Sequence, residues 1–220
     1  MDKNKKYIPA LGYDFLTAYY DIAIKITMPE KKFRELLVEE IKPQDGENIL
    51  EFGFGTGQNL LLVHQKNPRA ILSGVDIDPK VKAIAEHKLL KNKIEIPLNL
   101  YDGSTLQYAN GTFEKVYSCL VFHQLDALTK HKSLLELYRV LKPNGKLIIA
   151  DWGKAQNKLM RLTFGLVQLL DGFKTTNDNV KGLMPNFIKN AGFENVEVLK
   201  SINTAIGTFS YFKAIKKCCQ

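Results

Sequence analysis

The stretch ILEFGFGTGQN, from Ile49 to Asn59, places three glycines within five positions directly after a short apolar run. Glycine weakens ordered structure unless the backbone needs a positive φ or must approach another group closely. The apolar run is typical of a buried strand, and the residues from Gln58 onward have helical spacing. A glycine loop between a strand and a helix predicts that a ligand lies against the main chain here.

Strands and helices alternate along the chain on both sides of this loop. The patterns predict helices over 30–41, 58–66, 79–91 and 130–141, and strands over 48–52, 70–76, 95–101, 113–121 and 146–151. Asp78 followed by Pro79 is typical of a helix start, and Pro97 favours an edge or bulged position for its strand. Such alternation predicts a mostly parallel sheet with helices on both faces.

The last third of the chain has a different pattern. Helices are predicted over 159–170 and 180–190, followed by two β-rich runs over 194–202 and 205–215. A short turn joins these two runs, which favours an antiparallel pair at one edge of the sheet.

We expect one domain over residues 1–220, because there is neither a repeat nor a low-complexity linker. Within it we distinguish an N-terminal helical cap, a cofactor-binding core, a helical insertion or lid, and a C-terminal antiparallel β pair. These four parts correspond to residues 1–42, 43–152, 153–192 and 193–220.

Composition restricts the functions to be considered. No apolar stretch approaches the roughly 20 residues of a membrane span, and the basic N-terminus lacks the apolar core of a secretion signal, so we expect a cytosolic protein. The net charge is +8, but the lysines cluster at both ends, which favours solvated tails over a nucleic-acid surface. Three cysteines without ligand spacing predict no metal site.

Acidic residues follow three successive predicted strands, at the edge where an open parallel sheet binds its ligands. Glu51 stands two residues before the first glycine, Asp76 ends the next strand, and Asp102 follows the third. Glu51 would repel a pyrophosphate but attract an ammonium group. Asp76 is placed to accept hydrogen bonds from a ribose, and Asp102 from an amine such as that of adenine. A ligand with an amine, a ribose and an adenine, and without phosphates, fits S-adenosylmethionine.

Four segments in this order resemble the motifs of the class I S-adenosylmethionine-dependent methyltransferases. They are ILEFGFGTGQN, GVDIDP, YDGSTLQYANGTFEKVYSCLVFHQL and LYRVLKPNGKLIIADW, and the resemblance extends from about Glu30 to Trp152 and more loosely to the C-terminus. Within the class, the chain is most similar to the small-molecule branch with ubiquinone/menaquinone C-methyltransferases and bacterial phospholipid N-methyltransferases. The resemblance implies a Rossmann-like, doubly wound α/β fold whose seven-stranded sheet is mostly parallel with the last strand antiparallel.

The resemblance also implies a set of cofactor contacts. Residues around the methionine part of S-adenosylmethionine would be Glu51, Gly53, Gly55 and Gly57. Asp76 would hold the ribose with Ile77 against the adenine, Asp102 and Gly103 would meet the adenine edge, and Leu120 would line the sulfonium side. S-adenosylhomocysteine would be the product, and no metal is needed because the sulfonium already activates the methyl group.

Residues on the acceptor side are less firmly indicated. His123 is a candidate general base or hydrogen-bond partner. Tyr19 and Tyr20, with Tyr13, form either a lid over the cofactor or a packing face, and Trp152 either lines the acceptor pocket or caps the core.

Two further features could affect the acceptor pocket. Phe54 stands where the family usually has a small residue, so its ring would narrow the pocket or form part of its wall. The apolar segment 159–170 is interpreted first as a helix packed on the sheet, and otherwise as a lid or a membrane-facing surface.

The predicted activity is transfer of a methyl group by in-line displacement to a small or lipid-like acceptor. A glycine loop followed by an acid also suits an NAD-dependent oxidoreductase, although Glu51 and the C-terminal β pair disfavour it. A non-catalytic regulatory protein that binds S-adenosylmethionine is another alternative. RNA as the acceptor is disfavoured because no basic-aromatic block is present.

Overall fold

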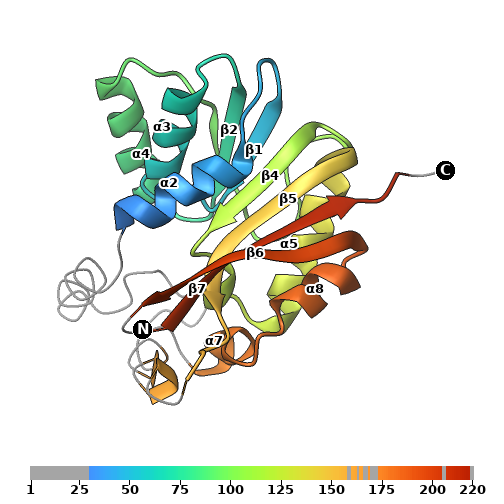
Figure 1. Ribbon diagram of the computed structural model, residues 1–220. Helices are drawn as coiled ribbons and strands as arrows, with labels where there is room; N and C mark the ends of the chain where they lie inside the picture. Colours follow the sequence, from blue (N-terminus) through green and yellow to red (C-terminus); the bar gives the residue numbers. More distant parts are fainter. Residues whose placement is uncertain are drawn as a thin grey trace.

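The computed structural model describes residues 30–157, 160–162, 164–165, 168, 173–204 and 207–218, and Figure 1 shows its arrangement. The first half contains α2 (Glu30–Ile41), β1 (Asn48–Phe52), α3 (Gln58–Lys66), β2 (Ile71–Asp76), α4 (Pro79–Lys91), β3 (Leu98–Leu100) and β4 (Phe113–Cys119). The second half contains the 3-10 turn η1 (Phe122–Gln124), α5 (Ala127–Val140), β5 (Leu141–Gly153), α7 (Phe173–Val180), α8 (Met184–Asn190), β6 (Phe193–Thr204) and β7 (Gly207–Lys216).

The seven strands form one sheet in the order β3-β2-β1-β4-β5-β7-β6. Strands β1 to β5 pair in parallel, whereas β7 is antiparallel to both β5 and β6. The predicted mostly parallel sheet with an antiparallel last strand is therefore confirmed. Strand order reverses between β1 and β4, so the carboxyl ends of these two strands mark the place where such a sheet binds ligands.

Helices cover the two faces of the sheet and create two apolar cores (Figure 1). On one face, Phe33 of α2, Leu60 of α3 and Leu89 of α4 pack with Tyr117 and Ile148 of the sheet. On the other face, residues of α5 and α8 pack against the alternate side chains of β1, β4 and β5. Both faces are buried, as a parallel sheet requires.

Capping residues explain where two helices begin. The Asp78 side chain accepts a hydrogen bond from the Lys80 N–H at 2.8 Å, and Pro79 occupies the first turn, as predicted for α4. Asp126 caps α5 in the same way, accepting from the Thr129 N–H at 2.8 Å. Helix α5 therefore begins at Ala127, three residues before the predicted start.

Strand β5 begins at Leu141, five residues before the predicted start at 146, and two other predicted elements also differ from the structure. Strand β3 covers only Leu98–Leu100 instead of 95–101, because Pro97 lacks the N–H that a longer strand would use for pairing. The single helix predicted over 180–190 is wrong. Helix α7 ends at Val180, Gly182 adopts a φ of +73°, and α8 starts afresh at Met184.

Half of the apolar segment 159–170 lies outside the described residues. Its described positions, 160–162, 164–165 and 168, are helical. Phe164 is buried, whereas Leu162 is 75% exposed, so the segment presents one face to the protein and another to solvent. Among the described helices, none is long and apolar enough to cross a membrane.

The ring of Phe54 belongs to the core beneath the glycine loop, not to the surface of the loop. Its side chain is 2% exposed, and a Cβ added at Gly74 of β2 would lie 2.8 Å from Phe54 Cδ1. The same Cβ would approach Leu98 Cδ2 to 2.9 Å and Leu60 Cδ1 to 3.1 Å. The absence of a side chain at Gly74 therefore makes room for the Phe54 ring.

We predict that Gly74→Ala lowers the free energy of unfolding by about 1–3 kcal/mol, because the added methyl group overfills this site. Combining it with Phe54→Leu should recover part of the loss, since the shorter side chain leaves space. Urea unfolding of the three proteins measures both effects, with the neighbouring Ser73→Ala as a control. Additive losses in the double variant would contradict the proposed packing.

Candidate functional site

The glycine loop after β1 combines close packing with an open backbone. Gly53, Gly55 and Gly57 have φ values of +76°, +51° and +72°, which side-chain-bearing residues rarely adopt. A Cβ at Gly53 would lie 2.3 Å from Val121 Cγ2, and one at Gly57 would lie 3.0 Å from Ala85 Cβ. No atom lies within 4 Å of a Cβ built at Gly55. Gly53 and Gly57 thus allow the loop to pack closely against Val121 and Ala85. At Gly55 the main chain is not covered by other atoms and can contact a ligand.

Asp76, at the carboxyl end of β2, is bound to this loop. Its Oδ2 accepts a hydrogen bond from the Gly55 N–H at 2.8 Å, and Oδ1 accepts from the N–H groups of Ile77 and Asp78 at 2.7 and 3.1 Å. Burial raises the pKa of the Asp76 carboxyl despite these three donors. Two carboxylate oxygens offer about four acceptor positions, so the group retains capacity for a ligand hydroxyl.

The third strand end lies beside the second, as the sequence predicts. Tyr101 N–H donates to the Asp76 carbonyl at 2.8 Å, and a Cβ at Gly103 would lie 3.9 Å from Ile77 Cδ1. Gly103 itself has a φ of +84°. Ile77, 37% exposed, and Gly103 therefore border the same space.

Asp102 forms a turn in this structure. It is exposed, and its Oδ1 accepts from Ser104 N–H at 2.8 Å and from Ser104 Oγ–H at 2.6 Å. These hydrogen bonds lower the pKa of the Asp102 carboxyl, so it is ionised at neutral pH. Its contact with an adenine stays a prediction.

Glu51 is completely buried and tied to two neighbours. Its Oε1 accepts from Asn59 Nδ2 at 2.8 Å, and its Oε2 accepts from the Tyr117 hydroxyl at 3.1 Å. Desolvation by burial raises the pKa of the Glu51 carboxyl to about 8. Asn59 Oδ1 in turn accepts a hydrogen bond from Arg34 Nη1, which connects α2 to the end of β1.

Sequence reasoning did not identify Asn59, Tyr117 or Arg34. Asn59 is the second residue of α3, so its proximity to the loop could have been inferred from the strand–loop–helix order. Tyr117 faces Glu51 because these residues are register partners in β1 and β4. No sequence pattern gives that register.

Leu120 occupies an unusual backbone position where β4 ends. Its φ is +58°, and its N–H donates to the Ala150 carbonyl of β5 at 2.9 Å. A branched residue rarely adopts a positive φ, and such positions cluster at functional sites. The strained turn directs the chain into η1, which carries His123.

His123 and Asp151 form a buried pair between η1 and the end of β5. His123 Nδ1 lies 2.8 Å from Asp151 Oδ1, and the His123 N–H donates to Asp151 Oδ2 at 3.2 Å. The Trp152 N–H also donates to Asp151 Oδ1, at 2.7 Å. A carboxylate only accepts, so a neutral His123 ring carries its proton on Nδ1 and has Nε2 as its basic nitrogen.

The other predicted acceptor-side residues are distributed differently. Trp152 is fully buried, with its ring centroid 5.5 Å from that of Phe164 and 6.0 Å from that of Phe209. Phe54 does not reach this region because its ring lies in the core beside Gly74. Tyr13, Tyr19 and Tyr20 lie outside the described residues.

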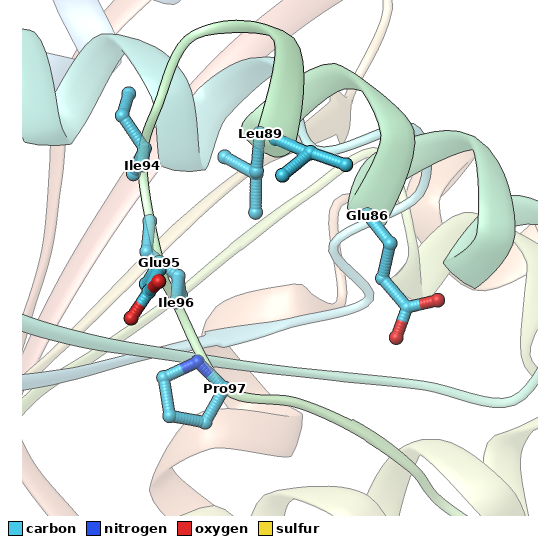
Figure 2. Close-up of a pocket in the computed structure, with 7 residues that line it drawn as sticks. Glu86, Leu89, Ile94, Glu95, Ile96 and Pro97 are labelled. Carbon is cyan, nitrogen blue, oxygen red and sulfur yellow. The ribbon is translucent and has the colours of Figure 1, made fainter.

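A groove of about 470 Å³ lies elsewhere, between α4 and the segment that leads into β3 (Figure 2). Its lining includes Leu89, Ile94 and Pro97, with Glu86 at one side. Pro97 directly precedes β3, so the groove borders the amino end of that strand and not the carboxyl ends where the loop lies. Within the described residues, no cluster of three or more histidine, cysteine or acidic side chains could hold a metal ion.

Comparison with known proteins identifies relatives of this arrangement. Residues 50–149 match the methyltransferase domain family. The chain is 25% identical over 181 residues to a demethylmenaquinone methyltransferase of Thermus thermophilus, covering 80% of each protein. It is 28% identical over 141 residues to a ubiquinone/menaquinone biosynthesis C-methyltransferase of Desulfotalea psychrophila, covering 63% of this chain and 56% of that protein.

A solved structure has the same fold. Phosphoethanolamine N-methyltransferase 2 of Haemonchus contortus, in complex with S-adenosyl-L-methionine, superimposes with a TM-score of 0.69 at 16% identity. The match covers 84% of this chain and 52% of that one. At this identity the likeness concerns the fold, and the sequence relatives carry the functional comparison.

We predict that Glu51→Gln changes the pH dependence of stability. The carboxyl is protonated in folded and unfolded chains below its ordinary pKa of 4.5, and ionised in both above about 8. Between these values the unfolded chain binds fewer protons, so the Glu51 group lowers the free energy of unfolding as pH rises. Urea unfolding across this range should show the variant gaining stability relative to wild type.

The matched control is Glu35→Gln on the exposed side of α2. Its stability should follow that of the wild type across the same range. Parallel curves for Glu51→Gln and wild type would show that the Glu51 carboxyl does not carry this dependence.

Proposed function

We propose that this chain, which belongs to the class I S-adenosylmethionine-dependent methyltransferases, transfers a methyl group to a small or lipid-like acceptor. The proposal rests on the hydrogen bond from the Gly55 N–H to Asp76, which joins the loop after β1 to the carboxyl end of β2. No atom lies within 4 Å of a Cβ built at Gly55, so the main chain is uncovered beside this bond. The sequence relatives named for demethylmenaquinone and for ubiquinone/menaquinone support an acceptor of small-molecule type.

S-adenosylmethionine supplies a methyl group already activated by its sulfonium. The proposed role of Gly53, Gly55 and Gly57 is to bring the backbone close to the methionine part. Asp76 would bind the ribose hydroxyls, with Ile77 and Gly103 on either side of the adenine space. Asp102 is ionised and exposed, so it could turn toward the adenine amine only if it exchanged its Ser104 hydrogen bonds.

The proposed role of Glu51 is to hold the glycine loop in place from the protein interior. Both of its carboxylate oxygens accept protein hydrogen bonds, and the side chain is fully buried. A cationic ammonium group near this carboxyl would lower its pKa, because an opposite charge favours the ionised form. Glu51 would then provide negative charge beneath the methionine part.

The acceptor side would be built at the carboxyl ends of β4 and β5. Leu120 would border the sulfonium side, and the His123–Asp151 pair follows immediately along the chain. Asp151 holds Nδ1 and the backbone of His123, and Nε2 is the nitrogen that would take a proton from an acceptor. Proximity and alignment supply the rest of the catalysis, because the leaving thioether is already a good leaving group.

We predict that Asp76→Asn weakens S-adenosylhomocysteine binding about tenfold or more, because the amide loses charged acceptor capacity toward both the loop and the ribose. Isothermal titration calorimetry measures this. The control is Asp78→Asn, which alters only the cap of α4 and should keep the wild-type affinity. If the wild-type protein does not bind S-adenosylhomocysteine, the proposed cofactor is wrong.

We predict that His123→Gln lowers kcat by about 10²- to 10⁴-fold, the range of general acid–base catalysis, while S-adenosylhomocysteine binding is retained. A short-chain demethylmenaquinol is the acceptor to test first, with phosphoethanolamine as the contrasting acceptor. Unchanged turnover in the variant would exclude His123 as the base. Binding of S-adenosylhomocysteine without turnover of any phenol, quinol, amine or lipid would favour a regulatory protein.

A further inference from the structure

Strand β3 is an edge of the sheet, and its outer side carries a row of backbone hydrogen-bonding groups. On the inner side, the Pro97 carbonyl accepts from the Gly74 N–H at 2.9 Å, and the Tyr101 N–H donates to the Asp76 carbonyl at 2.8 Å. Alternate residues of a strand direct their N–H and C=O groups to opposite edges. Pro97 and Tyr101, and Asn99 between them, therefore face β2. The residues whose backbone groups face outward are Ile96, Leu98 and Leu100.

Pro97 does not block this outer edge. A proline can protect an edge strand against further pairing, because it has no N–H to offer. The carbonyl of Pro97 accepts from Gly74 of β2, so the missing N–H of the same residue is on the β2 side. No described residue hydrogen-bonds to the backbone groups of the three outward residues. The edge thus keeps three donors and three acceptors for another strand.

The groove of about 470 Å³ lies beside this edge, on the side of the sheet that α4 covers (Figure 2). Ile94 and Ile96 pack against the same core as Leu89 of α4, so their side chains face that helix. Leu90 also lines the groove and is 75% exposed. A strand paired with β3 would place every second side chain on this side of the sheet, where an apolar one can fill the groove.

The charged side chains that line the groove are both acidic. Glu86 and Glu95 lie on opposite sides of Leu89 (Figure 2). Lys82 Nζ contacts Glu86 Oε1 at 2.8 Å, whereas Glu95 is exposed and has no ion pair with a described residue. Lys91 and Lys93 are near in sequence but are not part of the lining. A basic side chain on a bound segment would therefore pair with Glu95, and an acidic one would be repelled.

We propose that the outer edge of β3 and this groove form a docking site for a partner protein that adds an extended segment to the sheet. The main chain of the segment pairs with the outward groups of residues 96, 98 and 100. One of its apolar side chains enters the groove against Leu90, and a basic side chain two residues along pairs with Glu95. The groove is at the amino end of β3, so the docking does not depend on the proposed methyl transfer.

The first test measures amide hydrogen exchange in the intact protein by NMR. The N–H groups of Ile96, Leu98 and Leu100 should exchange fast, whereas those of Asn99 and Tyr101 should exchange slowly because they face β2. Protection of the outward set in dilute protein would mean that this chain covers its own edge. Protection that rises with protein concentration would mean that a second copy covers it. Either result would overturn the proposal.

The second test screens the protein against an array of short synthetic peptides in which threonine alternates with variable residues. The protein should select peptides with an apolar residue and a lysine or arginine two positions away, and reject the same peptides with glutamate there. No selection, or selection without the basic residue, would contradict the docking site.

A selected peptide then tests the backbone pairing. It should slow the exchange of the three outward amides, and methylation of its own N–H groups that face β3 should abolish binding. Methylation of the alternate N–H groups, which face away from β3, is the matched control and should be tolerated. Equal effects of the two methylation patterns would exclude strand addition.

Variants test the groove, with peptide affinity measured by fluorescence anisotropy. Leu90→Lys should weaken binding about tenfold or more, because it removes the apolar contact. The matched control is Ile84→Lys, at a position on the same helix that is 51% exposed and outside the lining, and it should keep the wild-type affinity. Glu95→Gln should weaken binding about threefold, the size of one exposed ion pair. Unchanged affinity in Leu90→Lys would overturn the role of the groove.

Discussion

The close approach of the glycine loop to the turn after β4 is the constraint on which the site depends. Val121 occupies the space that a side chain at Gly53 would need. Any larger residue at Gly53 would force apart the carboxyl ends of β1 and β4, where the strand order reverses. The positions of Leu120, η1 and His123 follow from this contact, because they continue the chain directly on either side of Val121.

The sequence predicted those parts of the fold whose signals are local. The limits of α2, β1 and α3 agree with the structure to the residue, because each is bounded by a break in apolar periodicity or by a glycine or proline. The failure at α7 and α8 has the opposite cause. The apolar spacing continues through this stretch, but Gly182 adopts a positive φ and Pro185 lies in the first turn of α8, so a helix ends and another begins where the periodicity alone predicts one.

In the candidate site, too, the sequence predicted residues from their position in an element but not the contacts between residues far apart in the chain. Asp76 was identified because it stands at a strand end, but its hydrogen bond to Gly55 required the two strand ends to be brought together. The Tyr117 side chain joins the site through its hydrogen bond to Glu51, 66 residues away along the chain. The position of the Phe54 ring in the core could not be predicted, because its accommodation depends on the missing side chain of Gly74, one strand away.

Strand β7 runs against its neighbours, so its first residue, Gly207, meets the last residues of β5. The proposed acceptor side therefore combines residues from two stretches of the chain, Leu120 and His123 in one and Asp151 in the other. The family match over 50–149 includes Leu120 and His123 and ends two residues before Asp151. Substitutions after residue 150 could therefore change one part of the proposed acceptor side and leave the glycine loop and Asp76 unchanged.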